Sequence, residues 1–210
     1  MPDKKRRGLR FNPFCESARV KFLRAAQLSG ETGLLDSKIS NKASNASVRT
    51  RSEREMKKLN AEYIQRVNHL VNHSPYFELL SMKILDVGLG FSLLEINLAE
   101  KHLQPFGFVH GGVFASIIDA ATFWAIFYEI EDQKAGATTV DLKLNYLAPA
   151  VSGKLIARGR QIKLGKTLGY AEAKVTDENS KLLAHGTSTL MILPGNGLAM
   201  DQPLPPKFSV

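Results

Sequence analysis

The stretch FGFVHGGVFASIIDAATFWAIFYEIED, residues 106–132, decides the fold. Residues 113–128 within it are almost wholly apolar, which predicts a helix that is buried on most of its surface. The run is shorter than the roughly 18 to 20 residues that a membrane-spanning helix needs, and a carboxylate at its centre would be costly in lipid. We therefore interpret it as the core helix of a globular domain, with Asp119 as its one charged residue.

The segments around this helix are predicted to be strands of one sheet. Residues 80–99 alternate around a turn, which suggests two strands. Four strand-like runs follow the helix: ATTVDLKLNYLAPA (137–150), GKLIARGRQIKLG (153–165), TLGYAEAKVTDE (167–178) and KLLAHGTSTLMILPG (181–195). Their connectors are short, so the strands should run antiparallel. The sequence predicts an α+β fold in which a strongly curved antiparallel sheet of about six strands wraps around one long apolar helix.

Two local patterns indicate which side chains share a face. Period-two alternation places these residues on one face of a strand: Val140, Leu142, Leu144 and Tyr146. Helical spacing places these residues on one face of a helix ahead of the sheet: Leu59, Tyr63, Val67, Leu70 and Val71.

Charge divides the chain into a basic first segment and a nearly neutral body. Residues 1–58 carry 15 Lys and Arg against 6 Asp and Glu, whereas residues 59–210 carry 13 against 14. The formal net charge of +8 therefore belongs to the first segment, and the body requires no polyanionic partner. We predict a basic, disordered extension over 1–58, a folded domain over 59–195 and a C-terminal tail over 196–210.

Two other interpretations of the basic segment stay open. The run MKKLN at Met56 has the form of a start, so the preceding residues need not be native. The run LLDSKISNKASNASVRTR (34–51) faintly resembles a helix-turn-helix, but it lacks the turn glycine and the apolar positions that would pack a recognition helix. The lone Cys15 cannot form an internal disulfide and no secretion leader opens the chain, so we expect a cytoplasmic protein.

Four motifs together resemble the hotdog-fold acyl-CoA thioesterases of the phenylacetate-pathway (PaaI) and thioesterase superfamily member 2 type. They are QPFGFVHGGVFASIIDAA, ATTVDLKLNYLAPA, KLGKTLGYAEAKV and KLLAHGTSTLMI, and the resemblance covers about residues 60–194. It implies a hydrolase that cleaves a coenzyme A thioester to the free acid and the thiol. It also implies no metal and no cofactor beyond the coenzyme A of the substrate, and a homodimer or a homotetramer built as a dimer of dimers.

The resemblance places the chemistry on the start and the middle of the apolar helix. Unpaired N–H groups and the helix dipole favour negative charge at a helix N-terminus, and glycine lets a ligand approach the backbone closely. The Gly111 N–H would stabilise the oxyanion, and Asp119 from the opposite subunit would be the nucleophile or the general base. The same comparison assigns supporting roles to three residues: Gln104 on the carbonyl or water, His110 on the loop or the carbonyl, and Thr139 on the attacking water.

Substrate binding is expected from residues near the motifs. Cationic side chains in ARGRQIKLGK suit the phosphates of coenzyme A, and they are Arg158, Arg160, Lys163 and Lys166. Gly112 would lie against the bound thioester. The candidates for the acyl pocket are Phe114, Ile118 and Trp124, which could equally be core residues.

Two other functional classes stay open. The basic first segment would suit an acyl-CoA-sensing regulator with a nucleic-acid-binding element, although a sensor has no need of the acid at Asp119. A hotdog scaffold without activity is the third possibility. His69 and His73 lie one turn apart and could bind a metal, but no third ligand is near them in the sequence, so we expect no metal site. We also expect no nucleic-acid partner, because the body of the chain is nearly neutral.

Overall fold

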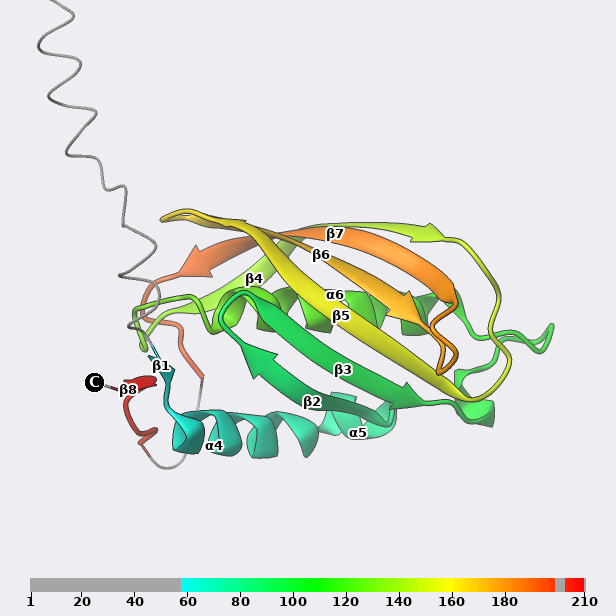
Figure 1. Cartoon of the computed structure of the whole chain (residues 1–210), viewed down its shortest axis with the longest axis horizontal. Coiled ribbons are helices and arrows are strands. Elements are labelled where there is room, and N and C mark those ends of the chain that lie inside the picture. Colours follow the sequence, from blue (N-terminus) through cyan, green and yellow to red (C-terminus); the bar gives the residue numbers. More distant parts are fainter. Residues whose placement is uncertain (1–57, 199–202, 210) are drawn as a thin grey trace, which may run out of the picture. The chain divides into compact units, whose positions relative to one another are not determined.

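The computed structural model describes residues 58–198 and 203–209 (Figure 1). All but one residue of the predicted basic extension lies outside these ranges. The described chain begins with the short strand β1 (Lys58–Leu59) and two helices, α4 (Ala61–Asn72) and α5 (Pro75–Leu79).

Helix α4 has the amphipathic character that its sequence predicts. The Asn60 side chain caps its first turn by accepting from the Glu62 N–H. Tyr63, Val67 and Val71 are buried. Leu70 is on the edge of that face and is 37% exposed.

The predicted six-stranded antiparallel sheet is confirmed. Its strands are β2 (Met82–Gly88), β3 (Phe91–Asn97), β4 (Gly136–Tyr146), β5 (Lys154–Leu164), β6 (Leu168–Thr176) and β7 (Leu182–Leu193). They lie in the order β2-β3-β5-β6-β7-β4, and every neighbouring pair is antiparallel. A short 3₁₀ turn, η2 (Glu100–His102), follows β3.

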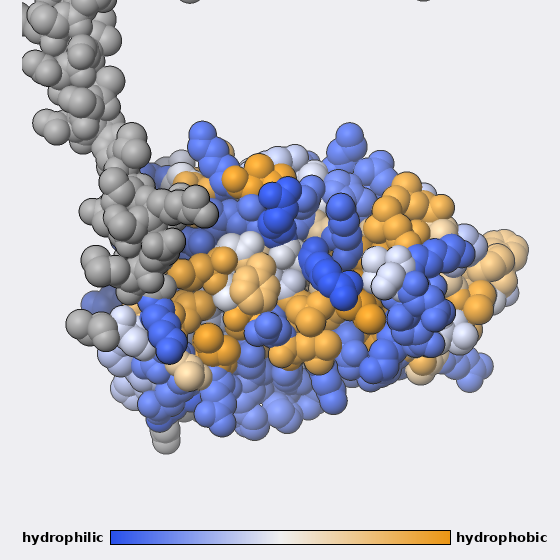
Figure 2. Space-filling model, in the orientation of Figure 1, coloured by the Kyte–Doolittle hydropathy of each residue, from blue (hydrophilic) through white to orange (hydrophobic). Residues whose placement is uncertain are grey.

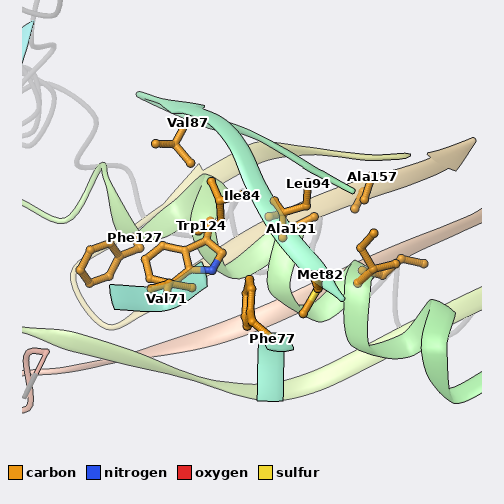
Figure 3. Packing of buried hydrophobic residues seen from close by; sticks show 14 of the residues in the cluster. Val71, Phe77, Met82, Ile84, Val87, Leu94, Ala121, Trp124, Phe127 and Ala157 are labelled. Carbon is orange, nitrogen blue, oxygen red and sulfur yellow. The ribbon is translucent and has the colours of Figure 1, made fainter. Parts of the chain in front are cut away.

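The apolar stretch forms α6 (Gly111–Phe127), which packs across the sheet (Figure 1). Figure 3 shows side chains of β2, β3 and α6, among them Met82, Leu94 and Trp124, packed in one core. Helix and sheet approach each other tightly at Gly159 of β5, where an added Cβ would lie 2.2 Å from the Ala121 carbonyl oxygen. Glycine at this position therefore lets α6 lie directly on the sheet.

A β-bulge in β4 changes the alternation that the sequence predicts. Between Thr139 and Asp141 the register against β7 shifts by one residue, and Val140 is 54% exposed. Thr139 opposes the buried Leu190, and Leu142 opposes the buried Ser188. Thr139 and Leu142 therefore face α6, whereas regular pleating would place them on opposite faces.

The C-terminal residues form a short strap across the start of α4 and the end of α6. Strand β8 (Phe208–Ser209) pairs antiparallel with β1. The Lys207 ammonium is buried, donates to the Phe127 carbonyl at 2.5 Å and to the Ile130 carbonyl at 2.8 Å, and lies 4.3 Å from the Phe127 ring centroid. These contacts place a cation at the negative end of α6.

Burial lowers the pKa of the Lys207 ammonium to about 7, although Glu129 opposes this effect. An unfolded lysine titrates near pH 10.4. Between about pH 7 and 10 the unfolded chain therefore holds a proton that the folded chain lacks, so we expect the free energy of unfolding to rise with pH in this window. Urea unfolding at several pH values should show this rise, and Lys207→Met should flatten it. An equal slope in the variant would contradict this role of Lys207.

Candidate active site

His110 caps the N-terminus of α6 through its side chain. Its Nδ1 accepts from the Gly112 N–H at 2.9 Å, and the Val113 N–H donates to its carbonyl. Since a backbone N–H can only donate, Nδ1 carries no proton here and Nε2 carries it in the neutral ring. The structure thus contains the backbone hydrogen bond that fixes the loop. His110 is exposed, and no described residue is hydrogen-bonded to its Nε2.

The cap leaves one backbone donor open at the helix start. The Gly111 N–H has no acceptor among the described residues. The Gly111 carbonyl accepts from the Tyr146 hydroxyl at 3.2 Å, so the residue is held from its other side. An N–H in this position can donate to an incoming carbonyl oxygen.

Asp119 is held in the middle of α6 by one side chain of the sheet. Thr139 Oγ1 donates to Asp119 Oδ1 at 2.7 Å. This contact exists because the β4 bulge turns Thr139 toward the helix. Oδ1 is thereby fixed, and Oδ2 remains to accept from a ligand or a water.

Asp119 lines a cavity of about 410 Å³, which we call the Asp119 cavity. Its walls are mostly apolar and include four aromatic rings. The lining residues are Tyr76, Phe77, Met82, Ala115, Ser116, Asp119, Ala120, Phe123, Trp124 and Leu142. A mostly apolar cavity with one carboxylate at its wall has the composition of a small-molecule site.

The structure does not bring Asp119 and Gly111 of one chain together. They are eight residues apart on the same helix, which is about 12 Å along its axis at the rise of an α-helix. Gly111, His110 and Gln104 are not among the residues that line the Asp119 cavity. One thioester carbonyl cannot contact both groups in a single chain.

Gln104 organises the loop that leads into α6. Its Oε1 accepts from the Phe106 N–H at 3.0 Å, and its backbone bonds with Phe108 and Gly107 close a tight turn. Phe106 at the tip is 83% exposed. In this structure the Gln104 carbonyl oxygen is thus engaged with the loop and its amide nitrogen remains for other contacts.

Arg158 and Arg160 lie on the outer face of the sheet, away from α6. They alternate with the buried Ala157 and Gly159 of β5. Figure 2, in the orientation of Figure 1, shows hydrophilic and hydrophobic side chains interspersed on the face where β3 and β5 lie in front of α6.

Arg160 is already paired on that face. Its guanidinium donates to Glu172 at 2.6 and 3.0 Å, and His185 lies 3.3 Å from the same carboxylate. The bonds from Arg160, then that from His185, hold the pKa of the Glu172 carboxyl below its usual range.

The two lysines proposed for phosphate binding lie near the β5–β6 turn. Both Lys163 and Lys166 are exposed, and neither forms an ion pair with a described residue. The turn is close to the C-terminal half of α6, because an added Cβ at Gly169 would meet Ile126.

The structure separates the three candidates for the acyl pocket. Trp124 lines the Asp119 cavity, whereas Phe114 and Ile118 are buried in the core and do not line it. Sequence reasoning missed Tyr76 and Phe77 of α5, Met82 of β2 and Phe123 of α6 as lining residues. The position of Phe123, one turn beyond Asp119, is the one signal that could have identified a member of this set.

His69 and His73 stack with ring centroids 4.4 Å apart, and no cluster of three His, Cys, Asp or Glu side chains lies within residues 58–198 and 203–209. None of the helices in these ranges is long and apolar enough to span a bilayer.

Comparisons with known proteins agree with this architecture. Residues 106–184 match the Thioesterase superfamily. The chain is 30% identical over 115 residues to a 1,4-dihydroxy-2-naphthoyl-CoA hydrolase of Listeria monocytogenes, a match that covers 55% of this chain and 93% of that enzyme. It is 29% identical over 99 residues to acyl-coenzyme A thioesterase 13 of Mus musculus, covering 46% and 69%.

A solved structure gives the same fold. The E. coli PaaI protein from the phenylacetic acid degradation operon superposes with a TM-score of 0.60 at 18% identity, over 67% of this chain and 100% of that one. The match to the superfamily and the identity to the Listeria enzyme together show that the chain belongs to the thioesterase superfamily and is a thioester hydrolase with the hotdog fold.

Proposed function

We propose that the protein hydrolyses acyl-coenzyme A thioesters, with Asp119 as the residue that activates water. The observation that carries the proposal is the Asp119 carboxylate, which Thr139 fixes at 2.7 Å on the wall of a mostly apolar cavity of about 410 Å³. The acyl group would fill this cavity, and its carbonyl carbon would lie beside the carboxylate. The names of the relatives support a coenzyme A thioester as the substrate class.

The reaction starts with an ionised Asp119. The carboxylate takes a proton from a water molecule while the water oxygen attacks the thioester carbon. The hydroxyl proton of Thr139 is engaged in the hydrogen bond to Asp119 Oδ1, so Thr139 Oγ1 can accept a hydrogen bond from the same water. Direct attack by Asp119 on the carbonyl is the alternative that the same position allows.

The carbonyl oxygen gains negative charge during this attack. The Gly111 N–H would donate to it, supported by the helix N-terminus, and the exposed Nε2–H of His110 could add a second bond. The C–S bond then breaks, the thiolate of coenzyme A takes the proton that Asp119 removed from the water, and the free acid leaves. Water is the only other reactant, so we propose that no cofactor takes part.

The separation of Gly111 and Asp119 supports a site shared by two subunits. An antiparallel pair of α6 helices would bring Gly111 of one chain beside Asp119 of the other. A two-fold dimer would then contain two equivalent sites. We propose this homodimer as the minimal active unit, with a dimer of dimers as a further assembly.

The phosphates of coenzyme A would bind to cations outside the cavity. Lys163 and Lys166 are exposed and without ion pairs among the described residues, which favours them for this role. Arg158 and Arg160 also remain candidates, but they lie on the outer face and Arg160 is bound to Glu172.

Release of free thiol from a panel of acyl-CoAs tests the proposal. We expect saturable release of coenzyme A from at least one aryl or medium-chain thioester, and a slower reaction with acyl groups too long for the cavity. Acyl-CoA binding without any thiol release would contradict the proposal and would support the sensing alternative.

A further inference from the structure

The C-terminal strap, residues 203–209, is fixed to the domain by backbone bonds at two places. The Asn60 N–H donates to the Lys207 carbonyl at 2.9 Å. The Gln133 side chain accepts from the Lys207 N–H at 3.1 Å and donates to the Pro205 carbonyl at 2.8 Å. Three of the seven strap residues are proline, which limits the conformational freedom that the segment loses when it docks. These bonds hold the strap in place without the side chain of Lys207.

The Lys207 side chain connects the strap to Phe127 at the end of α6. It is almost fully buried, which is rare for a lysine. Its Nζ donates to the carbonyl of Phe127 and lies 4.3 Å from the centroid of the Phe127 ring. Both the backbone and the ring of Phe127 are therefore in contact with the strap.

Phe127 belongs to a cluster of three aromatic rings that reaches the Asp119 cavity. Its ring stacks on Phe123 with centroids 5.8 Å apart and meets Trp124 edge-on at 5.2 Å, and the latter two rings are 5.0 Å from each other. Phe123 and Trp124 line the Asp119 cavity, whereas Phe127 does not. Figure 3 shows Phe127 beside Trp124 in the core. The contact from the strap to the cavity wall thus passes through the Phe127 ring.

An aromatic wall that is held in place before binding favours a ligand. An apolar group that enters an ordered cavity does not have to immobilise the side chains around it, so less of its binding energy is lost. The strap lies beyond residues 106–184, which match the superfamily, so the family match assigns it no role.

From these contacts we infer that Lys207 is a positioning residue for acyl binding. It holds Phe127, and Phe127 in turn holds the rings of Phe123 and Trp124 in the arrangement that binds the acyl group. The inference rests on the proposed function, since that places the acyl group in the Asp119 cavity. Lys207 itself contacts neither the substrate nor Asp119.

Trp124 is the only tryptophan of the chain, so its fluorescence reports on the cavity wall without any ligand. Lys207→Met keeps the length of the side chain but cannot donate. We expect this variant to show a constant for quenching of Trp124 by acrylamide about twice that of the wild type, because a looser wall admits the quencher more often. Lys181→Met, which removes an exposed lysine before β7, is the matched control and should keep the wild-type constant. Wild-type quenching in Lys207→Met would overturn the inference.

Steady-state kinetics with phenylacetyl-CoA and octanoyl-CoA separate positioning from chemistry. We expect Lys207→Met to raise KM about fivefold, as the loss of one contact between a cation and a ring would give, and to leave kcat unchanged. The value of kcat should hold because Asp119 and its bond from Thr139 lie two helical turns before Phe127. A lower kcat with an unchanged KM would contradict the inference.

Phe127→Leu tests the route through the ring. It removes the ring but keeps the carbonyl that accepts from Lys207. We expect it to raise KM by itself, and the addition of Lys207→Met should raise KM no further, because the two residues act in one chain of contacts. Additive effects would mean that Lys207 acts by another route and would overturn the inference. If Lys207→Met does not fold, an unchanged KM in Phe127→Leu overturns it.

The outcomes separate the inference from the proposed function. Thiol release with a wild-type KM in both Lys207→Met and Phe127→Leu would overturn the inference alone. Absence of thiol release from every acyl-CoA would overturn the proposed function, and the acyl-binding role of Lys207 with it.

Discussion

Asp119→Asn is expected to lower kcat by about 10³-fold, within the range that general bases contribute, while the substrate still binds. Asparagine has nearly the same shape, and its Oδ1 can still accept from Thr139, so the site geometry should persist. Its amide nitrogen cannot take a proton from water or attack the thioester. Steady-state thiol release gives kcat, and titration with a non-hydrolysable thioether analogue gives the affinity.

Asp141→Asn is the matched control for this loss. Asp141 is exposed on β4 and opposes Thr189 on the outer face of the sheet, away from α6. The same change of charge at this position should leave kcat unaltered. Wild-type kcat in the Asp119 variant would remove Asp119 from the mechanism.

Gly111→Val is expected to cause the second large loss, about 10²-fold or more in kcat, comparable to the loss of one oxyanion donor. A single Cβ at Gly111 would already lie 3.1 Å from the Tyr146 hydroxyl, and the two extra methyl groups would crowd the approach to the N–H. The smaller Gly111→Ala change should cost less, because the exposed Tyr146 side chain can move.

Combining Gly111→Ala with Tyr146→Ala tests the cause of this loss. The second change removes both the hydroxyl and the ring carbons of Tyr146 that the new Cβ meets, so activity should return if displacement of Tyr146 alone causes the loss. We expect little recovery, because the methyl group itself obstructs the substrate carbonyl. Circular dichroism and thermal melting should show folded protein in each variant, and full recovery would contradict an oxyanion role for this N–H.

The long helix could be predicted from sequence because its signals are local and agree with each other. The apolar run, the glycines at its start and the capping histidine all lie within residues 106–132, and α6 begins at Gly111. The six strands follow from alternation and short connectors, and their number and antiparallel pairing are confirmed.

The contact between Asp119 and Thr139 depends on a bulge that alternation cannot reveal. The pattern of Val140 and Leu142 suggests one common face, but the register shift turns Val140 outward and brings Thr139 to the inner face. Bulges arise from the pairing of two strands and not from one strand's own sequence. The resemblance to the family indicated Thr139, but the physical reason that its side chain reaches Asp119 is the bulge in β4, which only the pairing with β7 shows.

Tyr76 and Lys207 could not be predicted for a different reason. Each belongs to a short segment whose sequence pattern is weak, and each acquires its place through partners that are distant in the chain. Lysine is rarely buried, so composition predicts an exposed tail, whereas the acceptors at the end of α6 explain the buried Lys207. The C-terminal tail predicted over 196–210 thus includes a strand that pairs with β1.

A single mixing measurement tests the shared site most directly. Asp119→Asn chains and Gly111→Val chains, each inactive alone, are mixed in equal amounts and allowed to exchange subunits. Random exchange makes half of the dimers mixed, and each mixed dimer has one intact site, so thiol release should return to about one quarter of the wild-type rate. No recovery after confirmed subunit exchange would mean that each chain builds its own site, and it would contradict catalysis by Asp119 of one subunit and Gly111 of the other.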